Sequence, residues 1–80
     1  MDSISQKEAL QLYEQAIQLD ANYAGPHEGR GKILYRLGRY KEALAAYKQA
    51  IEIDSKFTDA LRGRDKVLQK LGSKTDETMR

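Results

Sequence analysis

The sequence repeats itself with a period of 34 residues. When residues 7–40 are aligned with residues 41–74, fifteen positions are identical. The runs Lys-Glu-Ala-Leu and Gln-Ala-Ile recur at the same place in both copies. A chain with a period of this length folds as a row of like units, in which each unit buries its apolar face against its neighbours. The repeat therefore restricts the fold more strongly than any other feature of the sequence.

Each period contains two helical patterns. In the first copy, Ala9, Tyr13 and Ala16 fall on one face of a helix, and the period carries the same pattern into the second copy. No segment shows the alternation of apolar and polar residues that is typical of a strand. We therefore predict an all-α chain of four helices, at about residues 5–20, 25–37, 40–54 and 58–71.

Capping signals set the ends of these helices. Ser5 with Glu8 fits a capping box. Pro26 suits the first turn of a helix, because the backbone N–H groups of that turn have no partner within the helix and the missing N–H of proline costs no hydrogen bond there. Gly38 and Gly72 are placed as C-cap glycines. We predict that residues 1–72 form a single helical domain and that residues 73–80 form a polar, flexible tail.

The composition excludes several classes of protein. The chain has 80 residues, no cysteine and one histidine, which excludes disulfides and leaves too few ligands for a usual zinc site. No apolar run approaches the ~20 residues of a membrane-spanning helix. The first residues lack the basic and apolar regions of a signal peptide. We expect a chain without metal, cofactor or membrane segment, in a reducing, cytoplasmic setting.

The residues do not point to catalysis. His27 is the only imidazole, and no serine or aspartate has a spacing that recommends it as a partner. We interpret His27 as a packing or surface residue, with ligand contact as the alternative. Gly29 and Gly63 fall within helices, where they indicate close packing of the backbone or, as the alternative, an opened groove. We favour packing, and we expect that the chain is not an enzyme.

A helix–turn–helix period of 34 residues with Gly38 at its internal turn resembles the tetratricopeptide repeat (TPR) family over residues 5–72. Tyr47 stands between two alanines at the spacing of that family, and Gly31 matches its small residue between paired helices. The resemblance implies antiparallel helix–turn–helix units in a short right-handed α-solenoid. It also implies a protein–protein interaction module.

The family's motif sets the phase of the units. Residues 24–57 correspond to one complete unit, residues 5–23 to the second helix of a preceding unit, and residues 58–72 to the first helix of a following one. The sequence departs from the family's preferred Trp, Leu, Tyr and two closing prolines at His27, Arg30, Leu34, Ala21 and Ser55, in that order. Charged Arg64 and Asp65, where a following helix would pack, are typical of a terminal helix.

Charge alternates between the two helices of each unit. Residues 24–40 and 58–74 each carry a net charge of +3, whereas residues 5–20 carry −2 and residues 41–54 carry −1. First helices line the concave surface in the family, so the resemblance implies a basic inner face. Basic residues at i, i+4 spacing form a stripe on each first helix, and the period places the stripes side by side. We predict that an acidic or extended partner segment binds there, at Lys32, Tyr35, Arg36, Arg62, Lys66, Gln69 and Lys70.

Other readings of this surface stay open. An ordinary solvated charged face is one alternative, and a small basic helical domain that binds nucleic acid is another. Nucleic acid is disfavoured, because acidic residues nearly cancel the basic ones and the chain has no tryptophan. A purely architectural segment of a longer repeat array is a third alternative. The asparagine-based carboxylate clamp of the family is not implied, because the only asparagine is Asn22, in a predicted turn.

The first helix lacks the helix that would precede it in a complete unit. Leu12 and Leu19 add apolar area to its uncovered face, where the second copy has the smaller Ala46 at the first of these sites. We therefore expect the isolated chain to form a homo-oligomer, either by two-fold pairing of first helices or by exchange of helices between chains. The predicted contact residues are Ala9, Leu12, Tyr13, Ala16 and Leu19.

Overall fold

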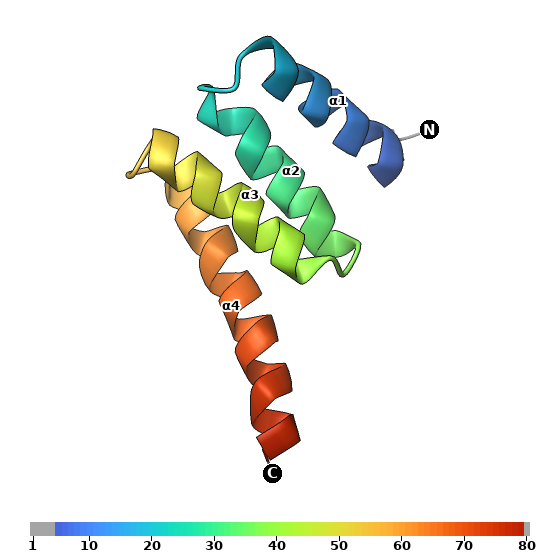
Figure 1. The fold of residues 1–80 in the computed structure, drawn as a ribbon, viewed down its shortest axis with the longest axis vertical. Helices are drawn as coiled ribbons and strands as arrows, with labels where there is room; N and C mark the ends of the chain where they lie inside the picture. Colours follow the sequence, from blue (N-terminus) through green and yellow to red (C-terminus); the bar gives the residue numbers. More distant parts are fainter. Residues whose placement is uncertain (1–4, 80) are drawn as a thin grey trace.

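The computed structural model describes residues 5–79 of the chain, with side chains described for residues 5–72. The fold is all-α. Four helices follow one another along the chain, each packed on the one before it (Figure 1). They are α1 (Gln6–Leu19), α2 (Ala24–Arg36), α3 (Tyr40–Ile53) and α4 (Thr58–Met79). No described helix is both long enough and apolar enough to cross a bilayer.

Local signals in the sequence set the ends of α1. The Ser5 hydroxyl accepts a hydrogen bond from the Glu8 backbone N–H, and the Glu8 carboxylate accepts one from the Ser5 N–H, which completes the predicted capping box. After α1, the Asp20 carboxylate accepts a hydrogen bond from the Asn22 N–H. The equivalent bond, from Lys56 N–H to Asp54, follows α3. The period therefore repeats the turn chemistry as well as the helices.

The turn between α2 and α3 depends on a glycine. Gly38 has a φ of +81°, a conformation that side chains other than glycine rarely adopt, and its N–H donates to the Tyr35 carbonyl. His27 supports the preceding turn, because its buried ring donates a hydrogen bond from Nε2 to the Ala21 carbonyl oxygen at 3.0 Å. This contact gives His27 a structural role, in agreement with the packing interpretation.

Helices α2 and α4 contact each other across α3, whereas α1 and α3 make no such contact in the part of the chain that the structure describes. The first helices of successive units are thus closer together than the second helices. This difference brings one side of α2 against one side of α4, and a cleft lies between them.

Tyr47 is the centre of the core. Its ring lies between Gly31 of α2 and Gly63 of α4, so close that a Cβ added at Gly63 would overlap it. A Cβ at Gly31 would lie 3.0 Å from the ring. Tyr47 is only 4% exposed, beside the fully buried Ala43 and Ala50. Small residues around one large ring let three helices approach closely, in agreement with the packing interpretation of Gly63, which also lines the cleft between α2 and α4.

Tyr13 is the equivalent residue of α1, but it is enclosed on one side only. Its ring lies against Gly29 of α2, as the ring of Tyr47 lies against Gly63. No described helix occupies the position that α2 has beside Tyr47, and Tyr13 is 36% exposed. The tyrosine at this position is thus packed between two helices in α3 but against only one helix in α1.

The fourth helix is longer than the sequence predicted. It does not end at Gly72 but continues to Met79, so residues 73–79 are helical rather than a polar tail, and residue 80 lies outside the described residues. Gly72 does not have the positive φ of Gly38. A glycine costs a helix only about 1 kcal/mol. It ends one reliably only where the chain must reverse, as it does at Gly38 but not at Gly72.

We predict that Gly63→Ala destabilises the chain, although alanine is the better helix former. The gain in helix propensity is about 1 kcal/mol, but the added methyl group meets an enclosed ring, and overpacking costs about 1–3 kcal/mol. Gly29→Ala is the matched control, because the Tyr13 ring can move toward its open side. Thermal unfolding should give a midpoint several degrees lower for Gly63→Ala than for Gly29→Ala. Equal midpoints would contradict the packing described for Tyr47.

Candidate partner-binding site

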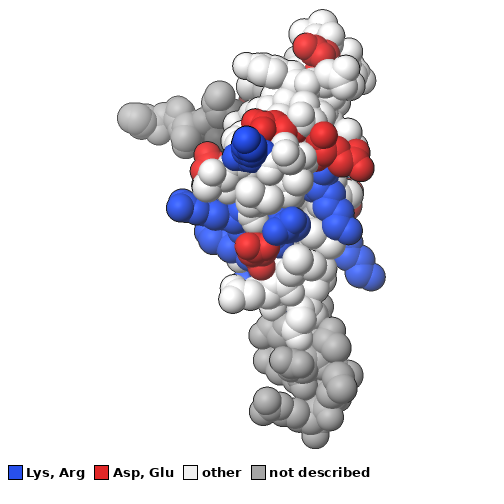
Figure 2. Space-filling model, turned by 90° about the vertical axis from the view of Figure 1, so that its left-hand side faces the viewer, with Lys and Arg blue, Asp and Glu red and all other residues white. Residues whose placement is uncertain are grey.

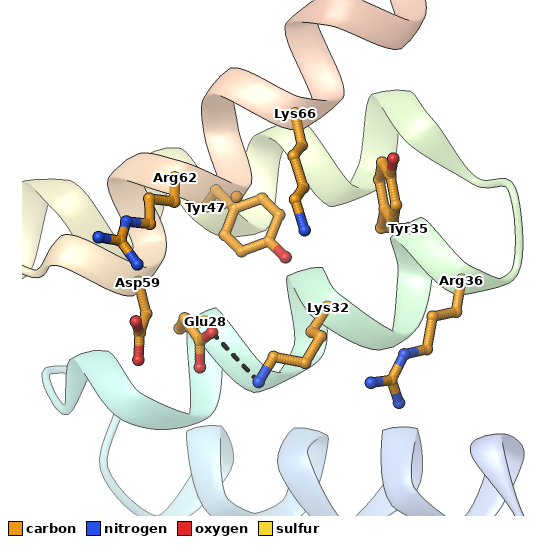
Figure 3. A pocket seen from close by; sticks show the side chains of 9 residues that line it. Glu28, Lys32, Tyr35, Arg36, Tyr47, Asp59, Arg62 and Lys66 are labelled. Carbon is orange, nitrogen blue, oxygen red and sulfur yellow. Dashed lines mark ion pairs between the residues drawn. The ribbon is translucent and has the colours of Figure 1, made fainter.

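A cleft of about 420 Å³ lies between α2 and α4, over the ring of Tyr47 (Figure 3). Helix α2 contributes one wall and α4 the other, because the two helices contact each other across α3. The residues that line the cleft are Glu28, Lys32, Tyr35, Arg36, Tyr47, Asp59, Arg62, Gly63 and Lys66.

The cleft contains most of the residues that the sequence places at a partner-binding face. Those that line it are Lys32, Tyr35, Arg36, Arg62 and Lys66. Gln69 and Lys70 are exposed on α4 but do not line the cleft. The period correctly places the two stripes side by side, but it does not show where the cleft ends.

Two acidic residues also line the cleft, and the sequence-based site omitted them. The Glu28 carboxylate pairs with the Lys32 ammonium at 3.7 Å, and Asp59 lies beside Arg62 (Figure 3). The same helical spacing that defined the basic stripes could have found both, since Glu28 precedes Lys32 by four residues and Asp59 precedes Arg62 by three. The lining therefore carries four cations and two anions.

These charges are not evenly distributed. Glu28 and Asp59 lie at one end of the cleft, whereas Arg36 and Tyr35 lie at the other, with Lys66 between them (Figure 3). The Tyr35 ring is tilted against the Tyr40 ring, with centroids 5.4 Å apart, which fixes an aromatic wall at the basic end. Arg62 lies beside Asp59 and Lys32 pairs with Glu28, so the first end has mixed charge, whereas the second end is basic and aromatic.

The phenol of Tyr47 lies at the floor of the cleft, and its hydroxyl points toward the side of Lys66 (Figure 3). Burial raises the pKa of Tyr47 to about 12, and the nearby negative charge of Glu28 adds to this effect. The phenol therefore stays protonated at physiological pH and is available as a hydrogen-bond donor to a ligand in the cleft.

Other basic residues of the first helices are paired elsewhere. Arg30 contacts Glu14 of α1 at 3.3 Å, and Arg64 pairs with Asp65 at 3.1 Å. Arg39 makes two contacts to Glu42, at 2.6 and 2.9 Å, which raise the pKa of the guanidinium and lower that of the carboxyl. The face of the molecule shown in Figure 2 accordingly mixes basic and acidic side chains. Much of the net positive charge that the sequence predicts for residues 24–40 and 58–74 therefore lies outside the cleft.

A comparison with protein families places the chain. The family model described as TPR repeat matches residues 5–38 and residues 31–72. The chain belongs to the TPR repeat family. A comparison with curated proteins finds no match. TPR repeats generally mediate protein–protein interactions, and TPR domains are typically non-catalytic.

The TPR period explains why the cleft has two equivalent walls. Lys66 of α4 is the 34-residue equivalent of Lys32 in α2, and Arg62 is the equivalent of Glu28. The first pair places a cation on both walls, whereas the second places opposite charges across from each other. Within the described part of this TPR chain, no group of three or more His, Asp or Glu side chains could hold a metal ion.

The structure also places the residues expected to mediate self-association. Leu12 and Leu19 of α1 are 53% and 88% exposed, and a shallow groove of about 300 Å³ runs beside Leu12. Ala9 and Ala16 are half-buried. Tyr13 differs from these four, because one side of its ring lies against Gly29 and only the other side is open. The uncovered part of α1 is therefore centred on the leucines.

We predict that alkaline pH destabilises the chain through Tyr47. The pKa of this phenol is about 12 in the folded chain and about 10 in the unfolded chain, so folding favours the protonated form. Its contribution to stability is complete below pH 10 and is lost as the pH rises toward 12. Urea unfolding across this range should show a smaller loss of stability in Tyr47→Phe than in wild type. Tyr13→Phe is the control and should follow wild type.

Proposed function

We propose that this TPR chain binds an extended, acidic protein segment in the cleft between α2 and α4. The proposal rests on one observation, which is that cations from two adjacent helices line both walls of one cleft. Lys32 and Arg36 lie on the α2 wall, and Arg62 and Lys66 lie on the α4 wall. A volume of about 420 Å³ lies within the ~300–1,000 Å³ range of ligand sites in proteins.

The lining favours carboxylates at one end of the cleft. Arg36 can bind a carboxylate with two parallel hydrogen bonds, and Lys66 supplies a compact positive charge beside it. The Tyr35 ring offers an apolar surface for a neighbouring side chain, and the protonated Tyr47 hydroxyl offers a further donor. An acidic residue of the partner would therefore bind at the basic, aromatic end.

Glu28 and Asp59 set the direction of the partner. Because Lys32 and Arg62 lie beside these carboxylates, their end has mixed charge and favours a carboxylate less than the basic end does. Glu28 and Asp59 can accept hydrogen bonds from a backbone N–H, a hydroxyl or an amine. Lys32 is already paired with Glu28, and its side chain is 53% exposed, so it can turn toward a ligand at little cost. The cleft thus favours a segment that is acidic at one end and neutral or basic at the other.

The same lining argues against nucleic acid and against catalysis. A phosphate backbone presents negative charge at every step, and two carboxylates in the cleft would oppose it. No described nucleophile stands beside a base in the cleft, so binding without chemistry is the function that the residues support. A cytoplasmic setting stays a prediction from the absence of cysteine.

We predict that Lys32→Glu combined with Lys66→Glu abolishes binding of an acidic segment. The probe is a short fluorescein-labelled peptide in which glutamate alternates with serine, compared by fluorescence anisotropy with the same peptide carrying glutamine. Each lost charge-assisted contact costs about 1.5–3 kcal/mol, so affinity should fall by about a hundredfold or more. Both side chains are exposed, and circular dichroism should show unchanged helicity.

The matched control is Lys41→Glu with Lys48→Glu, which makes the same change of net charge on the exposed surface of α3. It should bind the glutamate peptide nearly as well as wild type. An equal loss in both double variants would mean that overall charge, not the cleft, attracts the peptide. Wild-type affinity in the Lys32/Lys66 variant would exclude the cleft as the site. A labelled single-stranded oligonucleotide that binds more tightly than the peptide would favour the nucleic-acid alternative.

A further inference from the structure

Helix α1 carries an apolar strip that the other described helices cover only in part. The strip consists of Ala9, Leu12, Ala16 and Leu19, and its two leucines are among the most exposed large apolar residues of the chain. The equivalent positions of α3 are Ala43, Ala46, Ala50 and Ile53, of which the three alanines are almost completely buried. The difference arises because α3 packs on both α2 and α4, whereas α1 packs on α2 alone.

The size of Leu12 distinguishes the strip from an ordinary repeat position. Its equivalent, Ala46, is 3% exposed, and the small side chain lets α2 lie close to α3. A helix that approached α1 in the same way would have to accommodate the larger side chain of Leu12. The surface that covers α1 must therefore provide a hole for Leu12, and alanines provide such holes.

The strip is complementary to itself. Its residues are spaced by three, four and three positions, which is the heptad spacing of a helix that packs lengthwise against another. In an antiparallel pair centred on residue 14, Leu12 of one copy faces Ala16 of the other, and Leu19 faces Ala9. Every leucine then meets an alanine, and no two leucines compete for the same space. We propose that two copies of the chain dimerise through this antiparallel pairing of α1.

The positions beside the strip permit this pairing. In the same register Gln15 faces Gln15 of the second copy, and Tyr13 faces Tyr13 with the open side of its ring. Within α1, these flanking positions therefore bring no like charges together. Glu14, the acidic residue at the centre of the pair, is turned toward Arg30 of its own α2 at 3.3 Å.

The other uncovered face, on α4, does not fit α1. In a head-to-tail stack, α4 of one copy would pack on α1 of the next copy. It would pack there in the same way as α2 packs on α3 within one copy. Asp65 stands there at the position of Gly31, which closely approaches the Tyr47 ring. The Tyr13 ring would meet a carboxylate that is paired with Arg64. The mismatch disfavours an open chain of copies and favours a closed two-fold dimer.

The expected dimer is weak. A helix of 14 residues extends about 21 Å, so a pair of them buries on the order of 400 Å² per chain, which is about 800 Å² in total and in the range of weak, transient contacts. Dissociation constants in the range of tens of micromolar are therefore expected. Sedimentation equilibrium should show a reversible monomer–dimer equilibrium in this concentration range.

The decisive variant is Leu12→Gln with Leu19→Gln, which removes both leucines of the strip. Both side chains are exposed, so the fold should persist, and the dissociation constant should rise by at least about tenfold. The matched control is Leu37→Gln with Leu68→Gln, which changes two leucines of 42% and 45% exposure outside the strip. It should dimerise as wild type does. Loss of association in the control alone would show that copies join through α4, and the proposal would be wrong.

A cross-link tests the register. The sequence has no cysteine, so Gln15→Cys introduces a single thiol, which should form an intermolecular disulfide on mild oxidation. Lys48→Cys, exposed on α3, is the control and should cross-link much more slowly. A chain that stays monomeric at several hundred micromolar, or Gln15→Cys that cross-links no faster than Lys48→Cys, would overturn the proposal. Binding of the acidic peptide by the Leu12/Leu19 variant separates this result from any failure of the cleft.

Discussion

The position of Tyr47 between two glycines is the contact on which the other helix contacts depend. The ring fills the space that Gly31 and Gly63 leave open, and it touches helices on both sides of α3. A side chain in place of Gly63 would hold α4 away from α3. In a chain of 80 residues, where a core supplies only about 3–5 kcal/mol, one ring of this size accounts for much of the stability.

The same residue connects the core to the cleft. Its ring is buried in the core, and its hydroxyl reaches the floor between α2 and α4. The small residues that bring α2, α3 and α4 together therefore also set the distance between the two walls. Because Lys32 and Lys66 stand on those walls, the geometry of the cations follows from the packing of one tyrosine. The stability of the chain and the geometry of the cleft are thus not independent properties.

Most of the fold follows from the period, because every residue has an equivalent whose environment must be similar. That relation predicts the burial of Tyr47 and the close approach at Gly63 from the sequence alone. It cannot predict where a helix ends when no following unit is packed on it, which is why the C-terminal extent of α4 was missed. The period also does not define the cleft completely. Glu28 and Asp59 line it because of where they lie on their own helices, and neither has an acidic residue at its equivalent position.

The departures from the period carry most of the information about how the chain differs at its two ends. Leu12 stands where α3 has an alanine. It lies on an exposed face of α1, so it increases the apolar area that is in contact with water. Asp65 replaces a glycine on the opposite open face, where it keeps a charge exposed and blocks a close approach. One end is thus adapted to contact and the other to solvent. This asymmetry between the two helices supports the proposed closed pair over an open chain of copies.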